Sequence, residues 1–253
     1  MVIKHGAYDS QIESYKLSIE NVSATFQLVF QHPLLPNPNS IAALSTTEYL
    51  ITNDHYFRRR DGSLLPLLET YLGIPGGSIV YFAYDPDLPD GEKVTVKTLA
   101  RLPFANGIAM LNASTVAVAS SSDASVTLYT IKRLEGEKTP KLSVYRTINV
   151  SFHPDNLSVD GDGKLLITGH PHAPSLEKLA KNNGRCHSVQ NKTKANCDIR
   201  APSWIVEWSE GDGLQTLYTG IKYGSSTTAM RDVQRRLGLA VGLYAKGVLT
   251  WTL

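Results

Sequence analysis

The sequence lacks a clear excess of charge of either sign. Its 253 residues include 25 Lys and Arg against 23 Asp and Glu, which leaves a formal net charge of +2. A surface this balanced does not favour nucleic acid or an anionic membrane as the main partner. No apolar stretch approaches the roughly 18 residues of a membrane span. The first residues also lack the apolar core of a secretory leader, so as written nothing directs the chain into the secretory pathway.

Cysteine is scarce as well. Cys186 and Cys197 stand eleven positions apart in a polar segment without a CxxC pair. This argues against a metal finger and favours a local disulfide between them. Acceptor sequences for N-linked glycans occur at Asn21, Asn112, Asn149, Asn156 and Asn191. These features suit a secreted protein, whereas the N-terminus as written suggests a cytoplasmic one.

One pattern of strand, turn and second strand occurs four times. The repeats begin at Asn39, Asn106, Asn156 and Thr227. Further strand-like runs follow at residues 77–82, 124–129 and 203–208. Successive repeats start about 50 to 70 residues apart, which is the size of a four-stranded propeller blade with insertions in its loops.

We therefore predict an all-β protein with a single β-propeller domain over residues 1–253. A parallel α/β sheet needs long crossover helices, and the only helical candidates are short segments at 64–72 and 174–181. An all-β sandwich is the runner-up fold. It does not explain why one polar residue recurs at the start of the first strand of each repeat.

These recurring polar residues predict a metal site. Asn39, Asn106 and Asn156 open three of the repeats, and Asp155 stands beside the third. The innermost strands of a propeller line a central channel, so the side chains converge on one axis. Amide and carboxylate oxygens suit Ca²⁺, which takes about 6–8 oxygen ligands. The alternative is that these residues only form Asx-turns where the strands begin, and spacing alone does not decide between the two.

Longer stretches carry a resemblance to a known family. They are residues 32–44 (HPLLPNPNSIAAL), 52–57 (TNDHYF), 67–82 (LLETYLGIPGGSIVYF), 104–110 (FANGIAM), 154–160 (PDNLSVD) and 169–172 (GHPH). In combination and order they resemble the paraoxonase/arylesterase family of calcium-dependent, six-bladed propellers, in its fungal form. The resemblance runs from about residue 15 to the C-terminus.

The resemblance implies specific roles. It assigns Asn39, Asn106, Asp155 and Asn156 to the catalytic calcium, and Phe104 to the apolar wall of the pocket. It also implies hydrolysis of a small aryl ester or lactone, in which Ca²⁺ polarises the carbonyl oxygen and stabilises the oxyanion. The sequence contains no GxSxG, HExxH or GxGxxG motif, in agreement with a mechanism that needs no serine nucleophile.

Three departures from the family pattern stand out. The family has an opening blade that supplies a Glu ligand, an adjacent Asp and a His pair proposed as general base. No stretch of this sequence matches that blade, so we expect about four to five blades without these residues. Ser40 stands where the family usually has an Asp for a second, structural calcium, so that site is expected to be absent. Residues 173–200 form an insertion that holds both cysteines. It is either a lid over the channel or a surface excursion closed by the disulfide.

Few histidines can replace the lost base. His170 ends a hairpin and matches a pocket residue of the family. His55 ends an equivalent hairpin, where Asp54 can hold its tautomer, although a structural Asp–His hydrogen bond is an equal alternative. Three functions therefore stay open: a working calcium-dependent hydrolase, a truncated and inactive propeller, and a binding or biosynthetic-accessory module.

Overall fold

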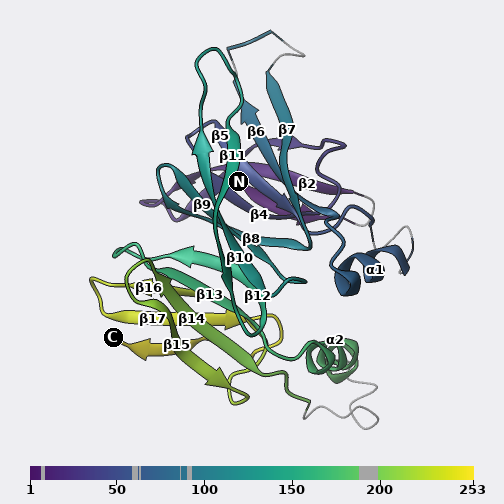
Figure 1. Cartoon of the computed structure of the whole chain (residues 1–253), viewed down its shortest axis with the longest axis vertical. Helices are drawn as coiled ribbons and strands as arrows, with labels where there is room; N and C mark the ends of the chain where they lie inside the picture. The colour runs from purple at the N-terminus through teal and green to yellow at the C-terminus, as the bar shows by residue number, and fades with distance from the viewer. Residues whose placement is uncertain (7–8, 59–61, 63, 86, 90–92, 188–198) are drawn as a thin grey trace.

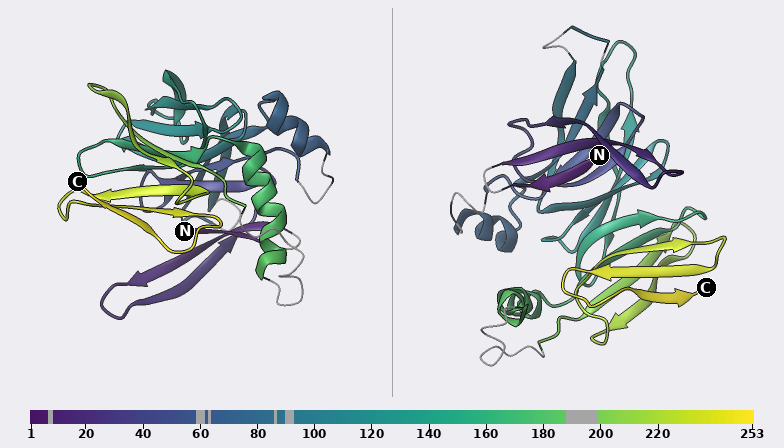
Figure 2. Two further views of the ribbon diagram at one scale, coloured as in Figure 1. Left: turned by 90° about the horizontal axis from the view of Figure 1, so that it is seen from below. Right: turned by 180° about the vertical axis from the view of Figure 1, so that it is seen from behind.

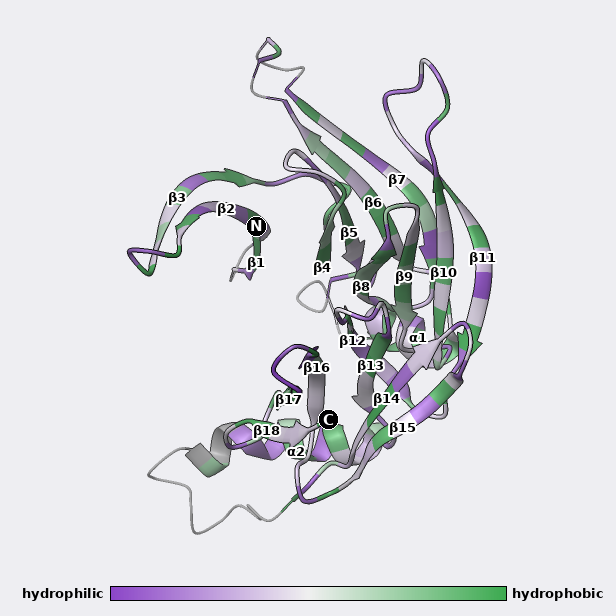
Figure 3. Ribbon diagram, turned by 90° about the vertical axis from the view of Figure 1, so that its left-hand side faces the viewer, coloured by the Kyte–Doolittle hydropathy of each residue, from purple (hydrophilic) through white to green (hydrophobic). Residues whose placement is uncertain are grey.

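The computed structural model describes all residues except 7–8, 59–61, 63, 86, 90–92 and 188–198. Over the described residues, 18 strands form five antiparallel sheets. The sheets follow one another in sequence order around an incomplete ring (Figure 1, Figure 3). This part of the chain is a β-propeller of five blades, which agrees with the predicted all-β class. The six-bladed type stays a prediction.

In the four later sheets, the strands run in chain order from the inner edge of the blade to its outer edge (Figure 3). The first sheet contains β1 (Val2–His5), β2 (Ser10–Ser18) and β3 (Ser23–Phe30). The second contains β4 (Pro38–Ala43), β5 (Glu48–Asn53), β6 (Gly77–Tyr84) and β7 (Val94–Leu102). The third contains β8 (Ala105–Asn112), β9 (Thr115–Ser120), β10 (Ser125–Lys132) and β11 (Lys141–Asn149). The fourth contains β12 (His153–Val159), β13 (Leu165–His170), β14 (Ser203–Ser209) and β15 (Gly213–Gly220). The fifth contains β16 (Ser226–Asp232), β17 (Leu237–Gly242) and β18 (Leu249–Thr252).

The four predicted repeats are confirmed as the first and second strands of the last four sheets. The first sheet, in contrast, gave no recognisable signal in the sequence. Its β3 is almost wholly exposed, and β2 mixes polar and apolar residues. Strand β2 lacks the short apolar run by which buried strands are found in a sequence, and β3 has such a run only in its last three residues.

The hydrophobic core lies between neighbouring sheets. Strands β5, β6, β9 and β13 are buried along most of their length, because a sheet of the ring packs on both of their faces. Between the second and third sheets, Leu50, Tyr81, Ile108 and Val118 belong to one buried cluster. Each such side chain contributes about 1.5–3 kcal/mol when it is fully buried. This packing holds the inner strands next to one another.

Two helices lie at the same end of the ring (Figure 2). Helix α1 (Leu64–Leu72) follows β5, and α2 (Ala173–His187) follows β13. Both helices are predicted by the sequence, although α2 is longer than expected. Since each follows a second strand, both leave the sheets at the end where the inner strands begin. In the described part of the chain, no helix is long and apolar enough to cross a membrane.

Candidate active site

The predicted metal ligands all lie near the starts of three inner strands. Asn39 is the second residue of β4, and Asn106 is the second residue of β8. Asp155 and Asn156 are the third and fourth residues of β12. Because β4 packs beside β8, and β8 beside β12, the three strand starts are neighbours. The fold therefore brings to one end of the ring residues that lie up to 117 positions apart in the sequence.

A threonine joins the first two of these strands. Thr52, at the end of β5, is fully buried, and its Oγ1 donates to the carbonyl oxygen of Asn106 at 2.6 Å. The Thr52 Oγ1 atom also accepts from the backbone N–H of Ser40 at 3.0 Å. One hydroxyl thus ties the backbone beside Asn39 to the backbone of Asn106. Two of the predicted ligands are held in a fixed relation by this link.

A glycine lets the next pair of strands approach. A Cβ atom at Gly107 would lie 2.6 Å from both the Asn156 Cα and the Asp155 carbonyl oxygen. Real Cβ atoms do not come this close to backbone atoms, so only glycine fits here. The backbone of β8 therefore touches the backbone of β12 directly beside the predicted ligands.

Asn106 is 7% exposed, and its amide group has a defined orientation. Its Nδ2 donates to the Ser121 hydroxyl at 3.0 Å, and that hydroxyl donates to the Pro154 carbonyl oxygen at 2.6 Å. The Asn106 Oδ1 is buried and has no hydrogen-bond partner in the structure. A buried acceptor of this kind normally has a partner. Its lone pairs are available to a cation.

Asp155 and His170 form the second polar pair of the site. The Oδ2 atom of Asp155 lies 3.1 Å from Nε2 of His170, and the His170 side chain is 9% exposed. The other ring nitrogen of His170, Nδ1, is buried and has no hydrogen-bond partner among the described residues. Asn156 uses its Nδ2 to donate to Thr228 at 3.0 Å. Its amide nitrogen is therefore turned to β16, and its oxygen is not used in that bond.

The donor set fits a hard cation. Within the described residues, no three His, Cys, Asp or Glu side chains group to hold a metal ion. Among the predicted ligands, Asp155 supplies the one carboxylate, and Asn39, Asn106 and Asn156 supply amide oxygens. Ca²⁺ accepts such a mixture of amide and carboxylate oxygens, whereas zinc prefers His and Cys.

Comparison with known proteins decides the family. A sequence model of the family described as arylesterase matches residues 1–197. The chain belongs to the arylesterase family. Dog (Canis lupus familiaris) serum paraoxonase/arylesterase 2 is 28% identical over 239 residues, which are 94% of this chain and 60% of the relative. Mouse (Mus musculus) serum paraoxonase/arylesterase 1 is 30% identical over 174 residues, which are 68% of this chain and 44% of the relative.

The resemblance read from the sequence is thus confirmed. This arylesterase-family chain spans 60% or less of the length of these two relatives. Solved structures support the fold. A gluconolactonase from Xanthomonas campestris superposes with a TM-score of 0.53 at 13% identity, covering 95% of this chain and 64% of its own. A protein of unknown function from Desulfotomaculum acetoxidans gives a TM-score of 0.52 at 10% identity, covering 96% and 62%. At these identities the likeness shows the fold alone.

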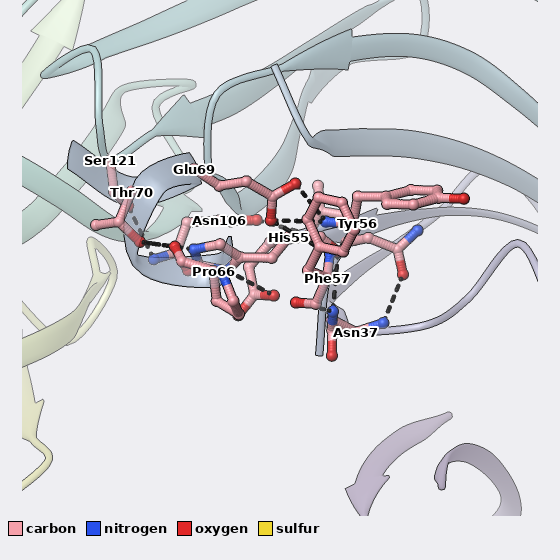
Figure 4. Close-up of polar contacts among 12 residues, drawn as sticks. Asn37, His55, Tyr56, Phe57, Pro66, Glu69, Thr70, Asn106 and Ser121 are labelled. Atoms are coloured by element: carbon pink, nitrogen blue, oxygen red, sulfur yellow. Dashed lines mark hydrogen bonds and ion pairs between the residues drawn. The ribbon is translucent and has the colours of Figure 1, made fainter. Parts of the chain in front are cut away.

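His55 is enclosed more tightly than His170. It is 3% exposed, its Nδ1 lies 3.1 Å from Asp54 Oδ1, and its Nε2 lies 2.7 Å from the Thr70 hydroxyl of α1 (Figure 4). Its ring packs against Phe104, with 4.5 Å between the ring centroids. Both nitrogens of His55 are engaged, so neither is left for a substrate or a water molecule. A catalytic role for His55 and Asp54, and the pocket role of Phe104, stay predictions.

Helix α1 is anchored to this arylesterase-family site by residues that sequence reasoning missed. The buried carboxylate of Glu69 accepts from the backbone N–H groups of Tyr56 and Phe57 at 3.2 and 3.3 Å (Figure 4). The Thr70 carbonyl oxygen accepts from the Ser122 hydroxyl at 2.7 Å. The sequence offers no signal for these contacts, because Glu69 and Thr70 look like ordinary polar positions of a surface helix.

Helix α2 begins the predicted insertion at 173–200. It lies at the same end of the ring as α1, and Glu177 of α2 accepts a hydrogen bond from Tyr71 of α1. Cys186 is in the last turn of α2, whereas Cys197 lies outside the described residues. The disulfide and the lid therefore stay predictions. The position of α2 is compatible with either role of the insertion.

Two networks of charged side chains lie at the opposite end of the sheets. Arg231 contacts Asp160 at 2.5 Å and Glu207 at 2.6 Å, and Lys164 also contacts Glu207 at 2.9 Å. Burial raises the pKa of Glu207, but its hydrogen bonds from the two cations outweigh this effect and lower the pKa. In a similar group, Glu48 accepts from Tyr81 and Arg133, and burial together with the carboxylate raises the Tyr81 pKa to about 12. These groups join neighbouring blades.

Proposed function

We propose that this chain is a calcium-dependent hydrolase of small aryl esters or lactones. The observation that carries the proposal is the buried Oδ1 of Asn106, which has no hydrogen-bond partner among the described residues, on a strand whose backbone approaches that of Asp155 in a chain of the arylesterase family. A buried amide oxygen without a donor is costly unless a ligand satisfies it. The relatives named serum paraoxonase/arylesterase support the choice of reaction class.

Four side chains are proposed to hold the cation: Asn39, Asn106, Asp155 and Asn156. They supply amide and carboxylate oxygens from three adjacent strands. Bound Ca²⁺ polarises the substrate carbonyl and stabilises the charge that develops on its oxygen. With a single carboxylate among the ligands, binding is expected to be weak, because Ca²⁺ affinity rises with the number of charged ligands.

His170 is the proposed general base. The carboxylate of Asp155 can only accept a hydrogen bond, so the proton of a neutral His170 lies on Nε2. This places the lone pair on Nδ1, which has no hydrogen-bond partner in the structure. Asp155 thus orients the imidazole and fixes its tautomer, and Nδ1 can take a proton from an attacking water. His55 lacks such a free nitrogen.

Hydrolysis assays test the proposal. Purified protein should turn over phenyl acetate or a small aliphatic lactone slowly, lose the activity in EDTA and regain it with Ca²⁺. The substitution His170→Gln should lower kcat by about 10²-fold, at the lower end of the range for general-base catalysis. His172→Gln is the matched control, because His172 is exposed at the same end of the ring and its ring contacts Ser175, which is not part of the proposed site.

Calorimetry separates the metal from the chemistry. The Asp155→Ala variant should lose most of its calcium affinity, since it removes the only charged ligand of the set. Unchanged affinity in this variant, or hydrolysis that survives EDTA, contradicts the calcium mechanism. If folded protein at saturating Ca²⁺ binds the ester or lactone without cleaving it, the chain is a binding module instead.

A further inference from the structure

Ser121 occupies a distinctive place beside the proposed calcium site. It directly follows β9 and is 7% exposed. The first repeat has Asp54 directly after its second strand, and the third has His170 as the last residue of its own. Ser121 therefore stands where the first repeat places Asp54, one position past the one at which the third repeat places His170, although a serine there carries no charge. The family resemblance assigns it no role.

The contacts of Ser121 join the third sheet to the fourth. Its hydroxyl contacts both the Asn106 amide and the Pro154 carbonyl oxygen, and its own carbonyl oxygen lies 2.9 Å from Nδ1 of His153. Pro154 and His153 directly precede Asp155. Ser121 thus contacts one proposed ligand and the backbone next to another.

The hydroxyl has only one proton, and this determines the direction of the whole chain of bonds. At 2.6 Å the proton goes to the Pro154 carbonyl oxygen, which can only accept. Toward Asn106, 3.0 Å away, the Ser121 oxygen must then accept, so Asn106 has to present its NH₂ group. The Oδ1 atom consequently points away from Ser121, where it is buried and unpartnered.

We infer that Ser121 is a positioning residue that fixes the Asn106 amide with its oxygen available to the cation. This inference rests on the proposed function. Without the hydroxyl, the amide can rotate and turn its NH₂ group toward the site, and the partial positive charge of that group repels a cation. Groups that hydrogen-bond a metal ligand typically change metal affinity by about 10–100-fold when they are removed.

Calcium titration of three variants tests the inference. Ser121→Ala should bind Ca²⁺ at least about tenfold more weakly than the parent, whereas Ser121→Thr, which keeps the hydroxyl, should stay within about threefold. Ser158→Ala is the matched control. Its hydroxyl also donates at 2.6 Å to a carbonyl oxygen of the next sheet, that of Ala229, without contacting a proposed ligand. This control should stay within about twofold of the parent.

A second measurement reads the amide orientation without metal. In the parent protein in EDTA, NMR should show a nuclear Overhauser effect between the Asn106 side-chain NH₂ protons and the Ser121 β protons. Absence of this effect, in a spectrum where the NH₂ signals are assigned, overturns the inference. Equal losses of calcium affinity in Ser121→Ala and Ser158→Ala also overturn it, since Ser121 then acts only through stability.

The two measurements distinguish the possible failures. If the parent binds no Ca²⁺, the proposed function is wrong about its cofactor, and Ser121 cannot orient Asn106 for a cation. The NMR result still decides whether Ser121 fixes the orientation of the Asn106 amide. If the parent binds Ca²⁺ and Ser121→Ala binds it equally well, only the role of Ser121 is wrong. Should Ser121→Ala not fold, Ser121→Thr and the parent NMR spectrum still decide.

Discussion

Replacing Gly107 by alanine should separate the two strands that carry the central ligands. The added Cβ would lie 2.6 Å from Asn156 Cα, 2.6 Å from the Asp155 carbonyl oxygen and 2.7 Å from the Leu157 backbone nitrogen. Carbon atoms normally keep about 3.5–4.0 Å from non-bonded neighbours. All three contacts are with backbone, so no side chain can move aside, and β8 and β12 must part by about 1 Å.

Two losses follow from this separation. Overpacking of a tightly packed site costs about 1–3 kcal/mol of unfolding free energy, and we expect the upper half of that range because only backbone can respond. A displacement of about 1 Å between catalytic groups can also lower the rate by about 10²-fold. Gly107→Ala should therefore be less stable in urea, bind Ca²⁺ more weakly and hydrolyse phenyl acetate far more slowly than the parent.

The matched control is Gly211→Ala. Gly211 lies in an exposed turn, and a Cβ there meets no atom within 4 Å. This variant should equal the parent or gain about 0.4–1 kcal/mol, because alanine restricts the unfolded chain. If Gly107→Ala matches Gly211→Ala in both unfolding free energy and calcium affinity, the close approach of β8 and β12 is not needed for the site, and the reasoning is refuted.

Two further predictions concern stability. The lowered pKa values of Glu48 and Glu207 imply stabilisation that is fully present above their ordinary pKa of 4.5 and is lost as the pH falls through the lowered values. The Tm, measured from pH 7 to pH 2, should therefore fall steeply below pH 4.5. A flatter fall of Tm in Glu207→Gln supports this origin, and an identical fall rejects it. Cys186 and Cys197 should form one disulfide in protein made in an oxidising compartment, contributing about 2–3 kcal/mol; non-reducing peptide mapping that recovers both as free thiols ends that expectation.

Much of the ring could be predicted from local sequence. The second strands around Leu50, Val118 and Ile167 are short apolar runs because both of their faces are buried, so burial leaves a direct trace in the sequence. The recurrence of Asn39, Asn106 and Asn156 at the starts of repeats also revealed their common location. A ring of similar units places equivalent positions at one end, so spacing alone was sufficient.

Other features depend on contacts that only the tertiary structure creates. The orientation of the Asn106 amide follows from its hydrogen bond to Ser121, whose hydroxyl donates to the carbonyl oxygen of Pro154. Pro154 lies 33 positions after Ser121, and no local sequence pattern indicates such a contact. The same holds for His55, because no local pattern shows that Thr70 of α1 lies 2.7 Å from its Nε2 atom. The sequence by itself determined which residue types gather at the site. The tertiary structure decided which atoms of those residues are already hydrogen-bonded and which are left for a ligand. A hydrogen bond depends on the positions of both partners, and here the partners come from different blades and helices.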